Sequence, residues 1–212
     1  MRNRYLTGNV VVSQAPLVAG IPISSIAISQ LDDNYRVVGN NNGALWFTAA
    51  GSSTLTSLDP VGAGSLIPDF YVALLAFDPL NKNTVYISLG NFSGNTTAAG
   101  SHVWRVTNLD TTPVLTALNG SGANVLPDVP VNAFAVDPLT PTKLYAGTDI
   151  GVFNSTDGGT TWNPYGVGLP RVAVFDMAIQ KTTGVLRIAT HGRGMWELLE
   201  PNLTDIFKDG FE

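Results

Sequence analysis

The sequence predicts an all-β fold built from repeated antiparallel sheets, and three observations lead to this prediction. Helix-favouring glutamate is scarce, whereas the chain of 212 residues contains 22 glycines and 13 prolines, which favours strands joined by turns. Short apolar segments alternate with turn residues along the whole chain. One apolar pattern also recurs four times, which is the signature of a repeat architecture.

The recurring pattern is centred on an alanine flanked by large apolar residues. The anchors are Ala27, Ala76, Ala135 and Ala178. Such a segment predicts a buried first strand in each copy. A second apolar strand is expected ten residues after each anchor, at Val37, Tyr86, Tyr145 and Ile188.

A third strand is predicted in every copy, and a fourth in only three of them. The third strands contain Leu45 to Phe47, Val103 to Val106, Val152 to Phe153 and Met195 to Leu198. The fourth strands are expected near Thr54 to Leu58, Val114 to Leu118 and Thr161 to Tyr165. Units of four antiparallel strands at this spacing are typical of propeller blades.

A tight β-hairpin is expected at Ser155 to Trp162. Asp157 can accept hydrogen bonds from amides of its own turn, and Gly158 and Gly159 can adopt positive φ. The spacing S-x-D-x-G-x-T-W is carried by Ser155, Asp157, Gly159, Thr161 and Trp162. It resembles the Asp-box of the BNR-repeat β-propellers, which include sialidase-like, xyloglucanase-like and sortilin-like proteins.

This resemblance implies a β-propeller with four blades of four antiparallel strands, and it implies a structural role for the five hairpin residues. The expected blades span about 21–68, 69–127, 128–170 and 171–200, followed by a C-terminal tail at 201–212. Residues 1–20 are expected to contain the outermost strand of a closing or preceding blade. Two alternatives remain open at this point: a closed ring of four blades, or the C-terminal portion of a larger propeller with six to eight blades.

Composition excludes several classes of function. With a net charge of −5 and no basic stripe, the chain is not expected to bind nucleic acid. Because the chain has no cysteine and only two histidines, no metal site is predicted, and no cofactor is expected. No apolar run is long enough to insert into a membrane, and no signal peptide is present, although the resemblance suggests a secreted or cell-surface bacterial protein.

The resemblance also implies that ligands meet the face formed by turns between second and third strands. The residues predicted there for ligand contact are Asn41, Asp149, His191 and Arg193. The expected partner is a protein or a carbohydrate.

Three functions compete at the level of sequence. No catalytic residue is assigned, so the leading hypothesis is a non-catalytic, extracytoplasmic binding module that serves as an interaction or structural platform. A glycoside hydrolase of the xyloglucan-cleaving type would need paired carboxylates, for which Asp149 with Asp69 or Asp128 are the candidates. An assembly factor for a membrane complex is the third hypothesis.

Overall fold

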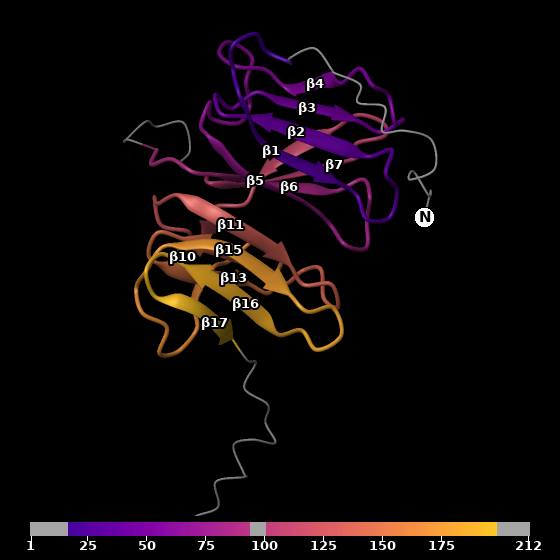
Figure 1. Ribbon diagram of the computed structural model, residues 1–212. Helices are drawn as coiled ribbons and strands as arrows, with labels where there is room; N and C mark the ends of the chain where they lie inside the picture. The colour runs from indigo at the N-terminus through magenta and orange to yellow at the C-terminus, as the bar shows by residue number, and fades with distance from the viewer. Residues whose placement is uncertain (1–16, 94–100, 199–212) are drawn as a thin grey trace, which may run out of the picture.

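The computed structural model describes residues 17–93 and 101–198, and this part of the chain is all β, as predicted. Four antiparallel sheets follow one another in chain order, and each is a simple meander (Figure 1). Within the described residues there is no helix that could cross a membrane. The tail at 201–212, and nearly all of the strand expected within 1–20, lie outside the described residues.

The first three sheets have four strands and the last has three. The first sheet contains β1 (Ile23–Ile28), β2 (Arg36–Asn40), β3 (Leu45–Thr48) and β4 (Thr56–Asp59). The second contains β5 (Val72–Phe77), β6 (Val85–Leu89), β7 (Val103–Thr107) and β8 (Val114–Ala117). The third contains β11 (Val131–Val136), β12 (Leu144–Thr148), β13 (Gly151–Ser155) and β14 (Asn163–Tyr165), and the fourth contains β15 (Val174–Ile179), β16 (Leu186–Thr190) and β17 (Gly194–Leu198).

One element was not predicted. A two-stranded hairpin, β9 (Gly120–Ser121) with β10 (Asn124–Val125), lies in the connection between the second and third sheets. Gly120 and Gly122 both have positive φ, which permits so short a turn.

The innermost strands share one register, with a single exception. The second strands contain Val37, Tyr86, Tyr145 and Ile188, as the repeat predicts. Ala27, Ala76 and Ala135 pair with Val37, Tyr86 and Tyr145, whereas Ala178 pairs with Arg187 and Ile188 pairs with Met177. The turn before the second strand is one residue shorter in the fourth sheet (180–185) than in the other sheets (29–35, 78–84 and 137–143), and this shifts the pairing by one position.

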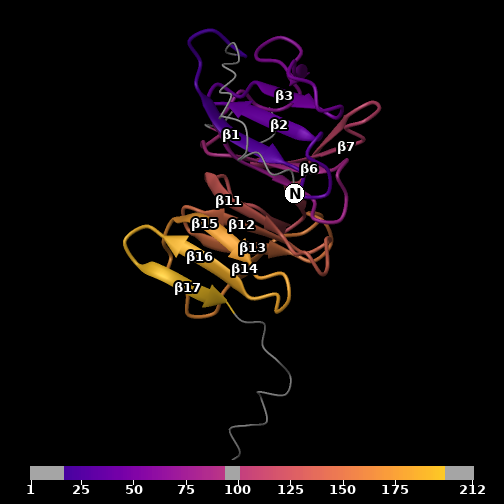
Figure 2. The same ribbon diagram turned by 45° about the vertical axis from the view of Figure 1, so that its right-hand side comes forward.

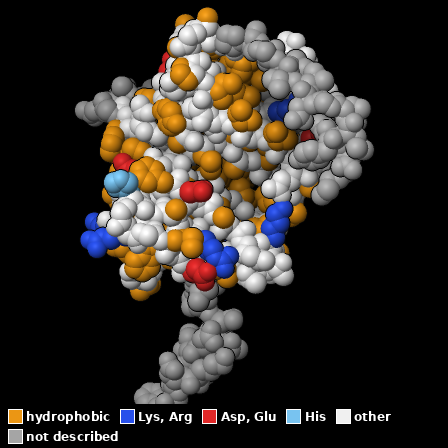
Figure 3. Space-filling model, viewed as in Figure 1, with side chains coloured by type: hydrophobic (Ala, Val, Ile, Leu, Met, Phe, Trp, Pro, Cys, Tyr) orange, Lys and Arg blue, Asp and Glu red, His pale blue; other side chains and the backbone are white. Residues whose placement is uncertain are grey.

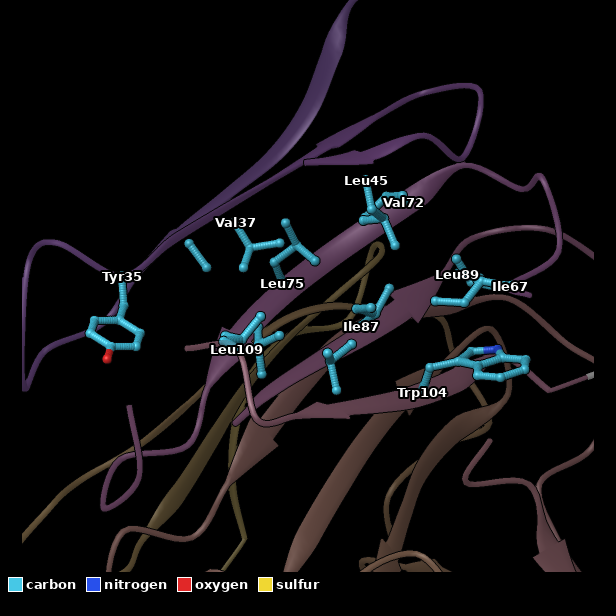
Figure 4. Packing of buried hydrophobic residues seen from close by; sticks show 13 residues of the cluster. Tyr35, Val37, Leu45, Ile67, Val72, Leu75, Ile87, Leu89, Trp104 and Leu109 are labelled. Carbon is cyan, nitrogen blue, oxygen red and sulfur yellow. The ribbon is translucent and has the colours of Figure 1, made fainter. Parts of the chain in front are cut away.

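The core lies between successive sheets rather than within any one of them. β1 packs on β5, β5 on β11, and β11 on β15. Figure 4 shows the first of these interfaces, where Val37 and Leu45 of the first sheet face Val72, Leu75 and Ile87 of the second. A Cβ placed on Gly39 would lie 2.5 Å from Val72 Cγ1, so the sheets approach closely at this position.

The four sheets form an arc whose two end faces are not covered by a neighbouring sheet among the described residues. The first sheet lies at the top of Figures 1 and 2 and the fourth at the bottom, and Lys181 Nζ, in the turn after β15, donates a hydrogen bond to Gln30 Oε1, in the turn after β1. On β1, Ile23, Ile26 and Ile28 are 49%, 60% and 54% exposed. The arrangement fits a portion of a larger propeller.

Candidate functional site

The turns between second and third strands form the face where the sequence predicts ligand contact. The four predicted residues lie on three of these turns: Asn41 between β2 and β3, Asp149 between β12 and β13, and His191 with Arg193 between β16 and β17. Strands β1, β11 and β15 run in the same direction, which places these turns at the same end of their sheets (Figure 1). Their role as ligand contacts remains a prediction.

Asp149 and Asn41 are held by contacts within their own blades. Asn132 Nδ2 donates a hydrogen bond to Asp149 Oδ1 at 2.8 Å. The backbone amide of Asn41 donates to the Pro22 carbonyl at 3.1 Å, and its side chain is exposed. The Asn41 side chain is therefore the more available of the two for a partner.

His191 and Arg193 lie on one turn, next to aromatic residues that sequence reasoning did not select. The His191 ring meets Phe175 edge to face, with ring centroids 5.5 Å apart. Trp196 Nε1 donates to the Arg193 carbonyl at 3.0 Å, and Arg193 itself is exposed. Phe175, Met195 and Trp196 are exposed as well, so this turn combines an imidazole, a cation and apolar surface (Figure 3).

A second polar cluster on this face joins three segments distant in sequence. Asp128, in the connection before β11, accepts hydrogen bonds from the Ser93 amide at 2.8 Å and from Ser93 Oγ at 2.7 Å. His102, which is fully buried at the start of β7, places Nε2 2.9 Å from Asp128 Oδ1. We call Ser93, His102 and Asp128 the Asp128 cluster; it links Ser93 and His102 to the connection before β11.

The neighbours of Asp128 favour the ionised form of its side chain over the protonated form. The Ser93 amide, then the Ser93 hydroxyl and His102, lower the pKa of Asp128 to about 2. His102 Nδ1 is buried without a hydrogen-bond partner among the described residues. Asp128 is therefore ionised throughout the physiological range and already engaged by its neighbours.

Asp69, the third candidate carboxylate of the hydrolase hypothesis, is also engaged. Its Oδ2 accepts a hydrogen bond from the Gly62 amide at 2.8 Å. No hydrogen bond joins Asp69, Asp128 and Asp149 to one another in the part of the chain that the structure describes, and each binds a different segment.

The hairpin at Ser155 to Trp162 is closed by its own side chains. Ser155 Oγ donates to Asp157 Oδ1 at 2.8 Å and accepts from the Gly159 amide at 2.8 Å. The Thr161 amide donates to Asp157 Oδ1 at 2.9 Å, and this bond is the main reason that the pKa of Asp157 lies below its usual value. Trp162 is buried and donates from Nε1 to the carbonyl of Leu118, the residue that follows β8, at 2.9 Å.

The molecule is hollowed in two other places. A cleft of about 370 Å³ lies among the innermost strands of all four sheets, with apolar walls and with Gln30, Asp78 and Lys181 at its rim. Because these residues lie at or after the ends of β1, β5 and β15, the cleft opens toward the face opposite the predicted residues. A second cleft of about 330 Å³ lies beside the Ile150 turn and is lined by Tyr165, Pro170 and Arg171 among others.

Within the described residues, no group of histidine, cysteine, aspartate or glutamate side chains has the arrangement needed to hold a metal ion. The carboxylates of the face are instead bonded to amides, hydroxyls and a buried imidazole. Such groups can fix the shape of the surface and present charge to a partner.

Comparison with known proteins gives a likeness of fold and not of sequence. No protein-family model matches the chain, and no curated protein sequence matches it. Among solved structures, the chain is similar to the GH74 enzyme of Niastella koreensis, with 15% identity and a TM-score of 0.59, over 84% of this chain and 28% of that one.

Two further solved structures show the same arrangement. The extracellular domain of a one-component system from B. thetaiotaomicron gives 15% identity and a TM-score of 0.60, over 84% of this chain and 21% of that one. The β-propeller domain of Cps50 (Swd1) from Myceliophteria thermophila gives 12% identity and a TM-score of 0.55, over 86% of this chain and 53% of that one. The chain thus spans about a quarter of the first two proteins and about half of the third. At these identities the likeness establishes a β-propeller fold and leaves the activity open.

Proposed function

We propose that the chain is a non-catalytic, extracytoplasmic propeller module of the Asp-box type that binds a protein or carbohydrate partner through its turns between second and third strands. The observation that carries the proposal is the state of the carboxylates on this face. Asp69, Asp128 and Asp149 each accept hydrogen bonds from a separate part of the scaffold. A surface that only binds a partner needs no carboxylate that exchanges a proton, so it is compatible with this arrangement.

A glycoside hydrolase needs one carboxylic acid that stays protonated near neutral pH, opposite a second carboxylate. Every aspartate of the described residues whose pKa clearly departs from its usual value has it lowered, and these are Asp32, Asp128 and Asp157. A general acid would require a raised pKa. This comparison supports binding over hydrolysis.

The most available part of the face is the turn of the fourth sheet. His191 and Arg193 are exposed there beside Phe175, so a partner can combine apolar contact with a hydrogen bond or an ion pair. Aromatic residues and arginine are the residue types that contribute most to binding at protein interfaces. This turn is therefore the proposed centre of the binding surface, with Asn41 and Asp149 at its margin.

The test measures binding and hydrolysis on one purified protein. Glycan and protein arrays identify a binder, and titration of that binder follows with a double variant, His191→Ala and Arg193→Ala. We expect the double variant to weaken binding at least tenfold, or about 1.4 kcal/mol. Leu139→Ala, an exposed apolar position on the opposite face, is the control and should leave the affinity unchanged.

Release of reducing ends from xyloglucan or another β-glucan is measured on the same sample. Activity that disappears with Asp149→Asn would replace the binding proposal with the hydrolase. Arrays without any binder sensitive to the His191 turn would equally overturn the assignment of this face.

A further inference from the structure

We propose that the cleft of about 370 Å³ among the innermost strands binds a small apolar carboxylate, whose alkyl chain lies between the strands and whose carboxylate binds Lys181 and Gln30. We call this cleft the central cleft. It opens on the turns between first and second strands, which span 29–35, 78–84, 137–143 and 180–185. The site is therefore separate from the opposite face, to which the proposed function belongs.

The walls of the central cleft come from all four sheets. The innermost strands β1, β5, β11 and β15 follow one another in contact around it (Figure 1). The apolar side chains that line the cleft include Ile26, Ile28, Phe77, Val136, Met177 and Ile179. Every lining residue lies within the described ranges 17–93 and 101–198, so the walls need no other part of the polypeptide.

Two of these side chains leave a large apolar surface open to solvent. Ile26 and Ile28 are 60% and 54% exposed, whereas Leu75, which corresponds in register to Ile26, is 5% exposed. Covering exposed apolar surface releases water and lowers the free energy. An alkyl chain in the central cleft contacts both isoleucines, because both line it.

Lys181 and Gln30 bring the fourth and first sheets together at the rim of the central cleft. Lys181 Nζ donates a hydrogen bond to Gln30 Oε1. An ammonium group has three N–H donors and a glutamine amide has two, so the pair retains donors for a carboxylate. Within residues 17–93 and 101–198, no carboxylate forms an ion pair with Lys181. Its charge is therefore available to a ligand.

Lys181 differs in this respect from the other two lysines of the described residues. Lys82 Nζ forms an ion pair with Asp32 Oδ2 at 2.8 Å. Lys143 Nζ lies over the Tyr145 ring, 5.8 Å from its centroid. Both lysines belong to turns between first and second strands, but neither lines the central cleft. The cation at the cleft is thus supplied by Lys181.

The carboxylate at the rim, Asp78, binds its own turn. Its Oδ1 accepts hydrogen bonds from the Leu80 and Asn81 amides at 2.8 and 3.1 Å, and the residue is 8% exposed. The exposed charge at the rim is therefore positive, which favours an anionic ligand over a cationic one. A volume of about 370 Å³ lies at the lower end of the range for small-molecule sites, which favours a short alkyl chain.

The first experiment titrates octanoate, octylamine and 1-octanol into the chain of 212 residues by calorimetry. Octanoate is expected to bind with a dissociation constant below about 1 mM. The amine and the alcohol should bind at least tenfold more weakly, because only the carboxylate accepts an ionic hydrogen bond from Lys181. Equal affinity for the three compounds, or no saturable binding of octanoate, overturns the proposal.

The second experiment tests the contact with the carboxylate. Lys181→Met keeps an unbranched side chain and removes the charge, so it should weaken octanoate binding about tenfold or more and leave octanol binding unchanged. Lys181→Arg should retain most of the affinity. Lys143→Met, in the turn before β12 and outside the cleft, is the matched control and should bind octanoate like the unaltered protein. Unchanged octanoate binding by Lys181→Met contradicts the assignment.

The third experiment tests the location of the alkyl chain. We call the side of the fourth sheet that carries Asp176, Ala178 and Ala189 its rear face. Both alanines are exposed, but only Ala178 lines the central cleft. Ala178→Phe should fill the cleft and abolish octanoate binding, whereas Ala189→Phe adds the same ring beside it and should leave the affinity unchanged. Equal effects of the two substitutions would place the ligand elsewhere.

Thermal unfolding confirms that all variants fold. A peptide that ends in leucine with a free carboxylate is the alternative occupant, and it is titrated under the same conditions. Tighter binding of this peptide than of octanoate overturns the assignment of the central cleft to a small molecule.

Discussion

Several polar side chains of this protein bind backbone groups of other segments, and Asp128 is the clearest example. This one carboxylate, in the connection between two sheets, binds a buried histidine and both the backbone amide and the hydroxyl of Ser93. Because half of the Asp128 side chain is exposed to solvent, water weakens these interactions. We estimate that the ionised group contributes about 1 kcal/mol to the free energy of unfolding after this discount.

The first prediction concerns the pH dependence of this contribution. A lowered pKa stabilises the fold above the unfolded value, so the contribution is complete above about pH 4 and is lost as the pH falls toward 2. Asp128→Asn should lower the free energy of unfolding by about 1 kcal/mol at pH 7 and change it little at pH 2. Urea unfolding at several pH values measures the difference. A difference that stays constant with pH would show that the charge is not the cause.

The Asp128 cluster also shows the limit of sequence reasoning at this scale. The sequence points to Asp128 as a residue of the connection, but it does not link His102 and Ser93 to it. They are 26 and 35 residues away in sequence, and no motif spacing joins them. Only the packing of the second sheet against the third brings the three side chains together.

At the level of strands and turns, glycines serve two different purposes in this protein: close contact between sheets and turns with positive φ. Gly39 of β2 has no positive φ, so its conformation is open to other residues, and its role is to leave space for Val72. Gly62, in the connection after β4, is the opposite case, because it has a φ of +83° and no atom within 4 Å of the position that a Cβ would take.

The second prediction compares these two glycines. Gly39→Ala should destabilise the protein by about 2 kcal/mol, because the added methyl forces the first two sheets apart. Gly62→Ala should lower the free energy of unfolding by only about 1 kcal/mol, the strain of a positive φ at alanine. Thermal and urea unfolding of the two variants measure the contrast. If Gly62→Ala lowers the free energy of unfolding more than Gly39→Ala does, the close contact between the first two sheets is not the reason for glycine at position 39.

The strands themselves followed from local pattern. Apolar alternation and turn residues predicted the third strands, and the fourth strands of the first three sheets, to within a few residues. The expectation that the last copy has no fourth strand concerns residues after Leu198, which lie outside the described residues. The sequence predicted that Ile188 lies in the second strand of the last copy, but it did not predict the pairing of that strand. The length of the preceding turn decides that Arg187, and not Ile188, pairs with Ala178.

At the scale of the whole molecule, the fourth sheet has fewer neighbouring strands among the described residues than the third sheet. Its rear face is exposed, and β17 lies at the edge of a three-stranded sheet within the described residues. The corresponding strand of the third sheet, β13, is paired on both sides by β12 and β14.

The third prediction follows from this difference. Amide hydrogen exchange should be at least tenfold faster in β17 than in β13, because strands at an exposed edge open locally at a lower free energy. Mass spectrometry of peptides covering the two strands measures the rates. Equal protection would mean that residues outside the described part cover β17, or that the arc unfolds as one unit.

The sequence alone determined the repeat, the all-β class and the hairpin at Ser155 to Trp162, because alternation, turn chemistry and side chain to backbone bonds act over a few residues. The tertiary structure decided which loops share the Asp128 cluster, where the clefts open and which faces stay uncovered. These features depend on how one sheet is placed on the next, and that placement arises from contacts between residues far apart in the chain, whose partners no local pattern specifies.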